Sequence, residues 1–458
     1  MTRISSCPVE ILHNILTFLP APDLKAVCLT NSHLRAVAQP VLYTSISIEL
    51  PSIKKGIPTI SYLISTLLRR RDLAAHVSTL KLNGNHLGMH FSYSNPHLPQ
   101  FFAYIKTLHL HYHNVWISFL QKGWADPFMA LLLAQLPNLQ SLHLDSDSIK
   151  ELQVTGELLK VALCDNNTDL PTFPHLRTVS FRPSHTIPGK PLTYHTPPNN
   201  PTALPLFYLP SLQTLHARID PPRKLIWPAP SPPTCTHLTT LHLEHIREGG
   251  PLGSILSATK NLRTLRWDIW YDAAARDSPE LRSERVSSPI INLDRIGSNL
   301  FRVSKTLEKL TITAECEADD LGLYRGVSTR GSLKKLRGMK RLVEVEVPLV
   351  LLVGIAASPG VRMEMGLPEC VERVVVTDDL EVLEEFGWTD GMVFGMVEAW
   401  MGEWRVSTPR LKGVKFWLRE MSEGFGPLLR ERLAEVFARE GVELEIVKEN
   451  VDGGLGEW

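Results

Sequence analysis

A single apolar signature recurs along most of the chain and constrains its fold more than any other feature. An apolar residue is followed by two spacers, a second apolar residue, one spacer and a third apolar residue. Because the last two apolar residues alternate with a spacer, each copy predicts a short strand that turns one face toward a core. The eleven copies begin at Val77, Ile105, Leu139, Leu176, Leu212, Leu238, Leu262, Leu307, Leu342, Val371 and Leu411.

The copies are unevenly spaced. The interval between central apolar residues runs from 24 positions, between Leu241 and Leu265, to 45 positions, between Leu265 and Leu310. In repeats of this kind the chain returns outside the strands, often as a helix, and neighbouring units stack. We therefore expect an α/β fold in which residues 76–458 form a curved solenoid, with parallel strands inside and helices and loops outside.

Two stretches are expected to be insertions in this array. Residues 182–233 hold 14 of the 34 prolines in the chain, which disfavours regular structure except around the copy at Leu212. Residues 271–289 are polar and charged. At the other end, residues 427–440 have a helical pattern, Gly441 is a typical helix stop, and a final strand follows from Val442.

The first fifty residues predict three short helices instead. A serine at position 5 or 6 can cap the first helix, Pro8 is tolerated in its first turn, and Pro20 ends it. Asp23 can cap the second helix. The third starts near Asn31 and should end by Pro40, because proline lacks the backbone N–H. Three helices this short bury little surface alone, which predicts that they pack against a partner.

Residues 4–50 resemble an F-box. The resemblance rests on a Pro-Val-Glu-Ile opening, an Ile-Leu pair one turn later, a Leu-Pro-x-x-Asp-Leu joint and an arginine before a Pro-Val-Leu-Tyr exit. Cys7 stands where the family usually has leucine, and the third helix lacks an aromatic residue often found there. A generic helical cap on the repeats is the alternative interpretation.

The resemblance implies a docking surface for a Skp-type adaptor, which links to a cullin ubiquitin-ligase scaffold. By position, the apolar residues that the adaptor and the module's own core would share are Pro8, Ile11, Leu12, Ile15, Leu16, Leu19, Leu24 and Leu29.

The array behind this segment resembles the degenerate leucine-rich repeats that follow F-boxes. Residues 51–75 look like the connecting helix that precedes the first repeat in many fungal members of that family. In such a solenoid the spacers between apolar positions line the concave face, which is an extended binding surface. The candidates for contact with a protein substrate are Lys81, His109, His143, His216, His242, Arg266, Glu344 and Glu346. The β-propensity of threonine, and the tolerance of histidine on a half-exposed sheet, account for the same pattern without a binding role.

We found no pattern typical of catalysis or of a cofactor site. The sequence has no GxSxG, GxxxxGK[ST], HExxH or CxxC motif. His109, His111 and His113 alternate along one expected strand, but no set of Cys, Asp or Glu nearby completes a metal site, so we interpret them as solvated strand histidines. We therefore expect no enzyme activity, no metal and no other cofactor.

Charge and cysteine content restrict the partners and the compartment. The chain has 48 basic and 48 acidic residues, so nothing draws it in general to nucleic acid or to an anionic membrane. Its longest uncharged apolar stretch, residues 347–361, contains Pro348 and Gly354 and falls short of the roughly 20 residues that a membrane span needs. Six dispersed cysteines suit a reducing compartment, the cytoplasm or the nucleus.

Two functions fit these observations. The first is a substrate-recognition subunit of an SCF-type cullin ubiquitin ligase, in which the F-box docks the adaptor and the repeats hold a protein substrate. The second is a non-catalytic leucine-rich-repeat scaffold with no role in ubiquitination. A hydrolase is disfavoured because the motifs that would support it are missing.

Overall fold

The chain divides into two compact units, and a computed structural model describes most of each. One unit comprises Met1–Ala217 and Trp227–Pro233, and the other comprises Arg218–Ile226 and Thr234–Trp458. The described residues are 7–50, 56–84, 95–146, 152–165, 169–183, 201–219, 225–246, 252–272, 290–317, 327–355, 361–381, 383, 386–418 and 425–448. None of the described helices combines the length and the apolar character that a membrane crossing requires.

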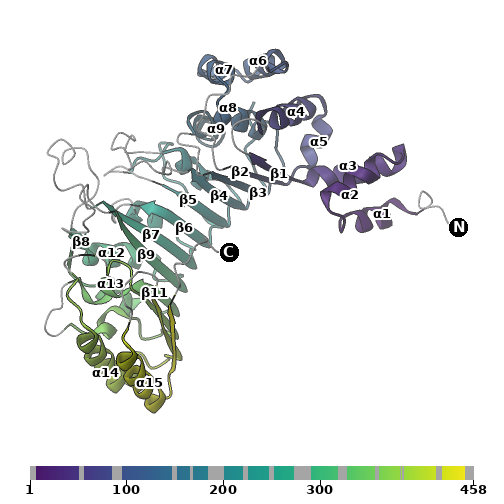
Figure 1. Cartoon of the computed structure of the whole chain (residues 1–458). Coiled ribbons are helices and arrows are strands. Elements are labelled where there is room, and N and C mark those ends of the chain that lie inside the picture. The colour runs from purple at the N-terminus through teal and green to yellow at the C-terminus, as the bar shows by residue number, and fades with distance from the viewer. Residues whose placement is uncertain are drawn as a thin grey trace. The chain divides into compact units, whose positions relative to one another are not determined.

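The first unit begins with the three expected helices, α1 (Val9–Leu16), α2 (Ala21–Cys28) and α3 (Ser32–Thr44), drawn in purple in Figure 1. Pro8, not a serine, occupies the N-cap of α1, and residues 5 and 6 lie outside the described residues. The N-cap of α2 is Pro20, with Asp23 in the first turn. Asn31 caps α3 as expected, with its side chain accepting a hydrogen bond from the Leu34 N–H at 2.8 Å.

The expected end of the third helix at Pro40 was wrong. The helix α3 continues through this proline to Thr44. Proline removes one intrahelical hydrogen bond. Val37 and Ala38, one turn earlier, are buried in the core of the three-helix module, and this packing holds the helix together across the missing bond.

The rest of the first unit is a parallel sheet with helices between its strands. Its five strands pair in chain order, β1 to β5. The elements after α3 are β1 (Ser45–Leu50), α4 (Gly56–Arg69), α5 (Arg71–His76), β2 (Thr79–Gly84), α6 (Leu98–Thr107), α7 (His113–Gln121), α8 (Ala125–Leu133), β3 (Ser141–Ser146), α9 (Gln153–Cys164), β4 (Thr178–Pro183), the 3-10 helix η2 (Pro201–Tyr208) and β5 (Thr214–Arg218). The helices α4, α8 and α9 pack together, as Figure 1 shows.

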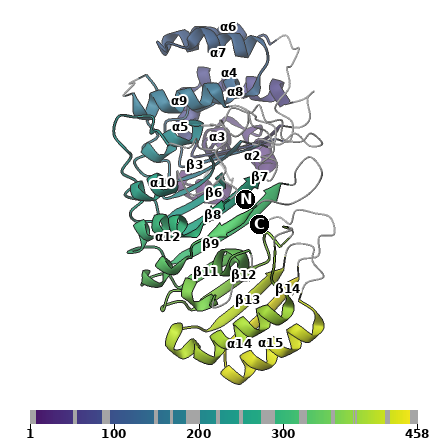
Figure 2. The same cartoon turned by 90° about the vertical axis from the view of Figure 1, so that its left-hand side faces the viewer.

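The second unit repeats this architecture. Seven strands pair side by side, in the order β6, β7, β9, β11, β12, β13, β14, and a short pair, β8 and β10, is also parallel. The elements are β6 (Thr240–Ile246), α10 (Leu252–Ala258), β7 (Thr264–Asp272), β8 (Ile290–Asn292), α12 (Leu293–Leu300), η4 (Phe301–Val303), β9 (Lys309–Glu317), β10 (Ser328–Arg330), η5 (Lys334–Gly338), β11 (Glu344–Pro348), α13 (Leu349–Val353), η6 (Met363–Gly366), β12 (Arg373–Thr377), α14 (Asp390–Ser407), β13 (Gly413–Leu418), α15 (Pro427–Glu440) and β14 (Glu443–Lys448). Figure 2 shows α14 and α15 packed side by side.

The signature residues align from strand to strand. In the first unit Leu80 pairs with Leu142, and Leu142 with Val179, all buried. The central residues of the second unit's signatures pair in the same way, in the order Leu241, Leu265, Leu310, Val345, Val374 and Val414, and Val414 pairs with Leu444 of the final strand. Each fully buried aliphatic side chain contributes about 1.5–3 kcal/mol, so this alignment stabilises the sheet.

A backbone relay reinforces this register just before each strand. In the second unit the N–H of Glu308 donates to the carbonyl of Arg263, and the N–H of Val343 donates to that of Glu308. The same step continues through Glu372 and Lys412. In each repeat one residue donates its N–H to the preceding repeat and accepts a hydrogen bond at its carbonyl from the next. The backbone groups at the turns into the strands therefore have partners only when neighbouring repeats are stacked.

One of the eleven signatures does not form a strand. Ile105 belongs to α6, and the copy that it starts crosses the end of that helix. The N–H groups of Leu108 and His109 donate to Ile105 and Lys106, and His109 has a left-handed φ of 50°. The prediction failed because Phe101, Ile105 and Leu108 also have the spacing of one helix face. All three side chains are buried, as the apolar face of a helix would be.

The α/β class and the parallel strands are confirmed, as is the C-terminal helix, which ends at Gly441 with a left-handed φ of 72°. The region between the first helices and the first signature forms two helices, α4 and α5, and β1 was not predicted at all. In the Pro-rich insertion, residues 184–200 and 220–224 lie outside the described residues, as do 273–289 of the polar insertion.

A buried carboxylate anchors one of the outer helices and provides a test of the fold. Asp126 in α8 accepts hydrogen bonds from the N–H groups of Val154 and Thr155, at 2.7 and 3.0 Å, at the start of α9. Replacing Asp126 with alanine should lower the free energy of opening of α9 by about 2–3 kcal/mol, because two buried N–H donors lose a charged acceptor. Hydrogen exchange of the α9 amides measures this. The control is Glu157→Ala on the same helix, which removes a half-exposed pair with Lys160 and should change the value by about 0.5 kcal/mol or less. Equal effects of the two variants would contradict the anchoring role.

Candidate functional site

The three-helix module divides its apolar side chains between a core and an exposed face. Leu12, Leu16 and Leu24 are 4–5% exposed and form the core with Val37 and Ala38. The exposed face, which we call the α1 face, consists of Ile11, Ile15 and Phe18, whose i, i+4, i+7 spacing places them on one side of the helix and whose exposed fractions are 51%, 53% and 88%. Val9 and Leu29 are also exposed, at 50% and 79%, outside this spacing. Water-exposed apolar side chains gathered on one small module mark a surface that another protein covers.

The eight residues expected to serve both core and adaptor are therefore separated. Leu12, Leu16 and Leu24 lie in the core, and Leu19 is half-buried against it. Pro8, Ile11, Ile15 and Leu29 are exposed. Sequence reasoning missed Val9 and Phe18, because neither lies on the stripe of helical periodicity that was used to choose candidates.

One polar contact fixes the second and third helices to each other. The Nε of Arg35 in α3 donates to the Cys28 carbonyl at the end of α2, at 2.9 Å. Partial burial raises the pKa of the Cys28 thiol, and the nearby Arg35 charge opposes this only in part. The thiol therefore stays protonated at neutral pH, and the pair acts structurally.

A family model described as F-box-like matches residues 4–49, the segment that forms these three helices. The N-terminus thus carries an F-box-like domain. F-box domains generally dock Skp-type adaptors, so the match indicates a ubiquitin-ligase adaptor role in general terms. A search of curated proteins finds no match to the chain.

In the first unit, three of the four candidates for substrate contact lie on strands. Lys81 is exposed on β2, and His143 is half-buried on β3, where its Nε2 lies 2.9 Å from the hydroxyl of Ser141. His216 is half-buried on β5.

The strand placement of His109, His111 and His113 was wrong, because His109 and His111 lie in the turn from α6 to α7 and His113 is the first residue of α7. The Nδ1 of His109 is 3.3 Å from a carboxylate oxygen of Asp169, and that of His113 is 2.8 Å from the Leu110 carbonyl. The ring of His111 packs edge-on against Tyr112. Their alternation in sequence therefore does not place the three side chains on one strand face.

The polar face of the second unit centres on Asp268 in β7. The Nε2 of His242 in β6 lies 2.6 Å from one carboxylate oxygen of Asp268. The hydroxyl of Thr313 in β9 donates to the other oxygen at 2.6 Å, and the Nε of Arg266 donates to it at 3.1 Å. His242 and Arg266 were predicted as surface candidates, but Asp268 and Thr313 were missed. Asp268 lies two residues beyond the candidate Arg266, and Thr313 lies two residues beyond Thr311, the spacer between Leu310 and Ile312, so extending the alternation by one step would have found both.

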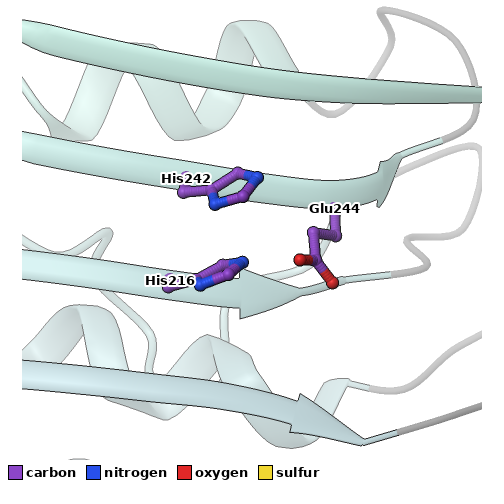
Figure 3. Close-up of side chains that lie close together, drawn as sticks. All are labelled: His216, His242 and Glu244. Carbon is purple, nitrogen blue, oxygen red and sulfur yellow. The ribbon is translucent and has the colours of Figure 1, made fainter. Parts of the chain in front are cut away.

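His242 and Glu244 project from the same side of β6, as Figure 3 shows, where His216 of β5 is also labelled. Glu244 is 3.4 Å from Arg218, and both side chains are mostly buried. His216 belongs to the first unit, whereas the other residues of this paragraph belong to the second.

Burial raises the pKa of Asp268, but the hydrogen bond and charge of His242, the charge of Arg266 and the hydroxyl of Thr313 outweigh it. The net result is a pKa far below the ordinary value. This carboxylate is therefore ionised at any physiological pH, and it joins three neighbouring strands across their polar face.

The last two candidates, Glu344 and Glu346 on β11, contact the neighbouring strand β9. The carboxylate of Glu344 is 3.1 Å from the Nζ of Lys309, and the hydroxyl of Thr311 donates to that of Glu346 at 3.5 Å. The pair of Glu344 with Lys309 is about half exposed, and pairs of this kind contribute about 0–1 kcal/mol, so a ligand could compete for Glu344 at small cost.

The separation of core from exposed face predicts different effects for two neighbouring residues. Leu12→Ala should reduce the stability of the three-helix module by about 2–4 kcal/mol, because it leaves a cavity in a small core. Ile15→Ala, at 53% exposure, should cost about 0.5 kcal/mol or less. Hydrogen exchange of the α1–α3 amides in the full chain compares them. A loss of protection in Ile15→Ala as large as in Leu12→Ala would be incompatible with the observed burial.

The low pKa of Asp268 predicts how its contribution depends on pH. A carboxyl whose pKa is lowered by folding stabilises the protein above its unfolded value of 3.8, and this stabilisation is lost as the pH falls toward the folded value. Asp268→Asn should therefore destabilise the chain by about 1–3 kcal/mol near neutral pH. The difference from the wild type, measured by urea unfolding, should shrink below pH 3.8. A difference that grows on acidification would refute the ionised pairing.

Proposed function

We propose that this protein is the substrate-recognition subunit of an SCF-type cullin ubiquitin ligase. The F-box-like module docks a Skp-type adaptor, and the adaptor connects it to the cullin. The observation that carries the proposal is the α1 face on a segment that matches an F-box-like family model. It provides the unpartnered apolar surface that adaptor docking requires.

The energetics of the α1 face support docking. A fully buried aliphatic or phenylalanine side chain contributes about 1.5–3 kcal/mol. The three such side chains of the α1 face, already half or more exposed in the free chain, exceed the lower estimates of the association cost, about 4–15 kcal/mol. The core residues Leu12, Leu16 and Leu24 contribute indirectly, because they fix the direction of α1.

We infer that the two sheets belong to one irregular leucine-rich-repeat array of the type found behind fungal F-boxes. The support is the signature itself, which aligns in register within each unit, and the long, uneven repeats. In this interpretation the polar face of the strands binds a protein substrate, as the concave faces of solenoids do. Its candidate contacts are the residues around His242, Arg266 and Glu346.

The protein itself is proposed to be non-catalytic and to need no cofactor. Its contribution is proximity: holding a substrate beside a charged conjugating enzyme raises the effective concentration of the reacting groups. Its proposed partners are proteins, not nucleic acid or membrane. Its proposed compartment is the cytoplasm or the nucleus, where it would assemble with the other subunits of such a ligase.

A charge placed in the α1 face tests the function. Ile15→Asp should abolish co-purification of the Skp-type adaptor and the cullin, because an aspartate buried at the interface has no partner. The control is Val115→Asp on α7, which replaces a residue of similar exposure, 50% against 53% for Ile15, elsewhere in the first unit and should leave co-purification intact. Retained adaptor binding in Ile15→Asp would overturn the proposal. Recovery of the adaptor without the cullin from the unmodified protein would instead support a scaffold without a ligase role.

A further inference from the structure

A small cavity opens at the carboxyl edge of the sheet in the second unit. It lies where β11, β12 and β13 end, next to the start of α14, and its volume is about 40 Å³. Leu349 follows β11 directly, Thr377 is the last residue of β12, and Leu418 is the last residue of β13. Ligands of open parallel sheets commonly bind at this edge, because the strands end there together.

The described residues that line the cavity carry charge of one sign. Four carboxylates line it, from Asp378, Asp379, Glu381 and Asp390, and no Lys, Arg or His is among the described lining residues. Asp378 and Asp379 are 8% and 4% exposed. One oxygen of Asp379 accepts a hydrogen bond from the Ala314 N–H at 2.8 Å, which ties the acidic turn after β12 to β9.

The remaining walls are apolar and aromatic. Val376, Val393 and Leu418 provide aliphatic surface, and Phe386, Trp388 and Phe416 provide rings. The Nε1 of Trp388 donates to the Gly354 carbonyl at 2.8 Å, so the orientation of this ring is fixed. A ring face held beside carboxylates attracts a cation, and aliphatic walls suit an alkyl stem.

A buried hydroxyl points to a missing hydrogen-bond partner. Thr377 lines the cavity and is 1% exposed, and its Oγ1 has no partner among the described residues. Buried hydroxyls are nearly always satisfied, so one without a partner beside a cavity is the place for a ligand donor. An ammonium group has three N–H donors and no acceptor, which matches a hydroxyl lone pair and several carboxylates.

The size and spacing of the site favour an organic cation over a metal ion. A volume near 40 Å³ admits a group of a few heavy atoms. In the described part of the chain, the carboxylates of this cavity do not form a group of three with ligand atoms within 4.8 Å of one another, as a metal would need. The positive end of α14 faces the cavity, but its half charge is small beside four carboxylates.

We propose that this cavity binds a primary ammonium group on an aliphatic stem, the chemistry of a lysine side chain. The Thr377 hydroxyl and at most two of the carboxylates accept its hydrogen bonds, and the aromatic and aliphatic walls pack along the stem. The site stands on its own geometry. Only the step that assigns the lysine to a substrate protein rests on the proposed ligase function. If that function holds, the substrate is recognised in part through an accessible lysine side chain.

The test uses the full chain and Nα-acetyl-lysine amide as the probe. The indole N–H resonance of Trp388, assigned by its loss in Trp388→Phe, should shift on titration. Nα-acetyl-norleucine amide, which keeps the stem without the charge, should produce no shift at the same concentrations. An equal response to the norleucine probe would show a plain apolar pocket and overturn the proposal, as would a stronger response to Ca²⁺ than to the lysine probe.

Two variants locate the binding groups. The double variant Glu381→Gln, Asp390→Asn keeps the size of both side chains and should raise the Kd for the lysine probe by about 10-fold or more. The control Glu398→Gln removes one exposed carboxylate farther along α14 and should leave the Kd unchanged. Unchanged affinity in the double variant, or an equal loss in the control, would place the cation elsewhere.

Thr377→Val separates a binding role from a structural one. Valine has nearly the shape of threonine, so removing an unsatisfied hydroxyl should maintain or raise the Tm of the free chain. The same change should raise the Kd for the lysine probe several-fold. A lower Tm would mean that the hydroxyl serves the fold, which contradicts the proposal. Adaptor co-purification should be unaffected in all these variants. Loss of probe binding therefore tests the cavity, whereas loss of the adaptor in Ile15→Asp tests the ligase function.

Discussion

The register between parallel strands is the constraint on which the rest of the structure depends. Leu142 is buried only when it lies between Leu80 and Val179, and the same holds for the central residue of each repeat in the second unit. A slip of one residue would turn these side chains to the solvent and bury the polar residues between them. The backbone relay that enters each strand holds the same register, so apolar packing and hydrogen bonding reinforce each other.

Because the register is fixed, side chains from neighbouring repeats meet at defined positions. Asp268 is in contact with His242 and Thr313 only because β6, β7 and β9 are aligned as they are. The acidic cavity has the same origin. Strands that end at one edge bring Thr377 and Leu418, which are far apart in sequence, to a single site. A repeat array therefore builds sites from residues that no local motif connects.

Much of the fold could be predicted from sequence because the repeated signature reports burial directly. Ten of its eleven copies lead into strands, and Gly441 ends the last helix as its φ allows. The copy at Ile105 failed because a step of three residues between apolar positions fits a helix as well as the lead-in to a strand. The extension of α3 past Pro40 failed for a different reason, since packing of Val37 and Ala38 outweighs a local propensity.

The sequence alone determined the parallel α/β repeat and the helical F-box-like segment, because both are written in local periodicity. Tertiary structure decided which apolar residues of that segment face water: Leu12 and Ile15 lie on the same predicted stripe, yet only packing against α3 buries the first and leaves the second exposed. It also decided that Asp268 joins three strands and that four carboxylates share one cavity. Those outcomes depend on contacts between residues distant in sequence, and local periodicity carries no information about such contacts.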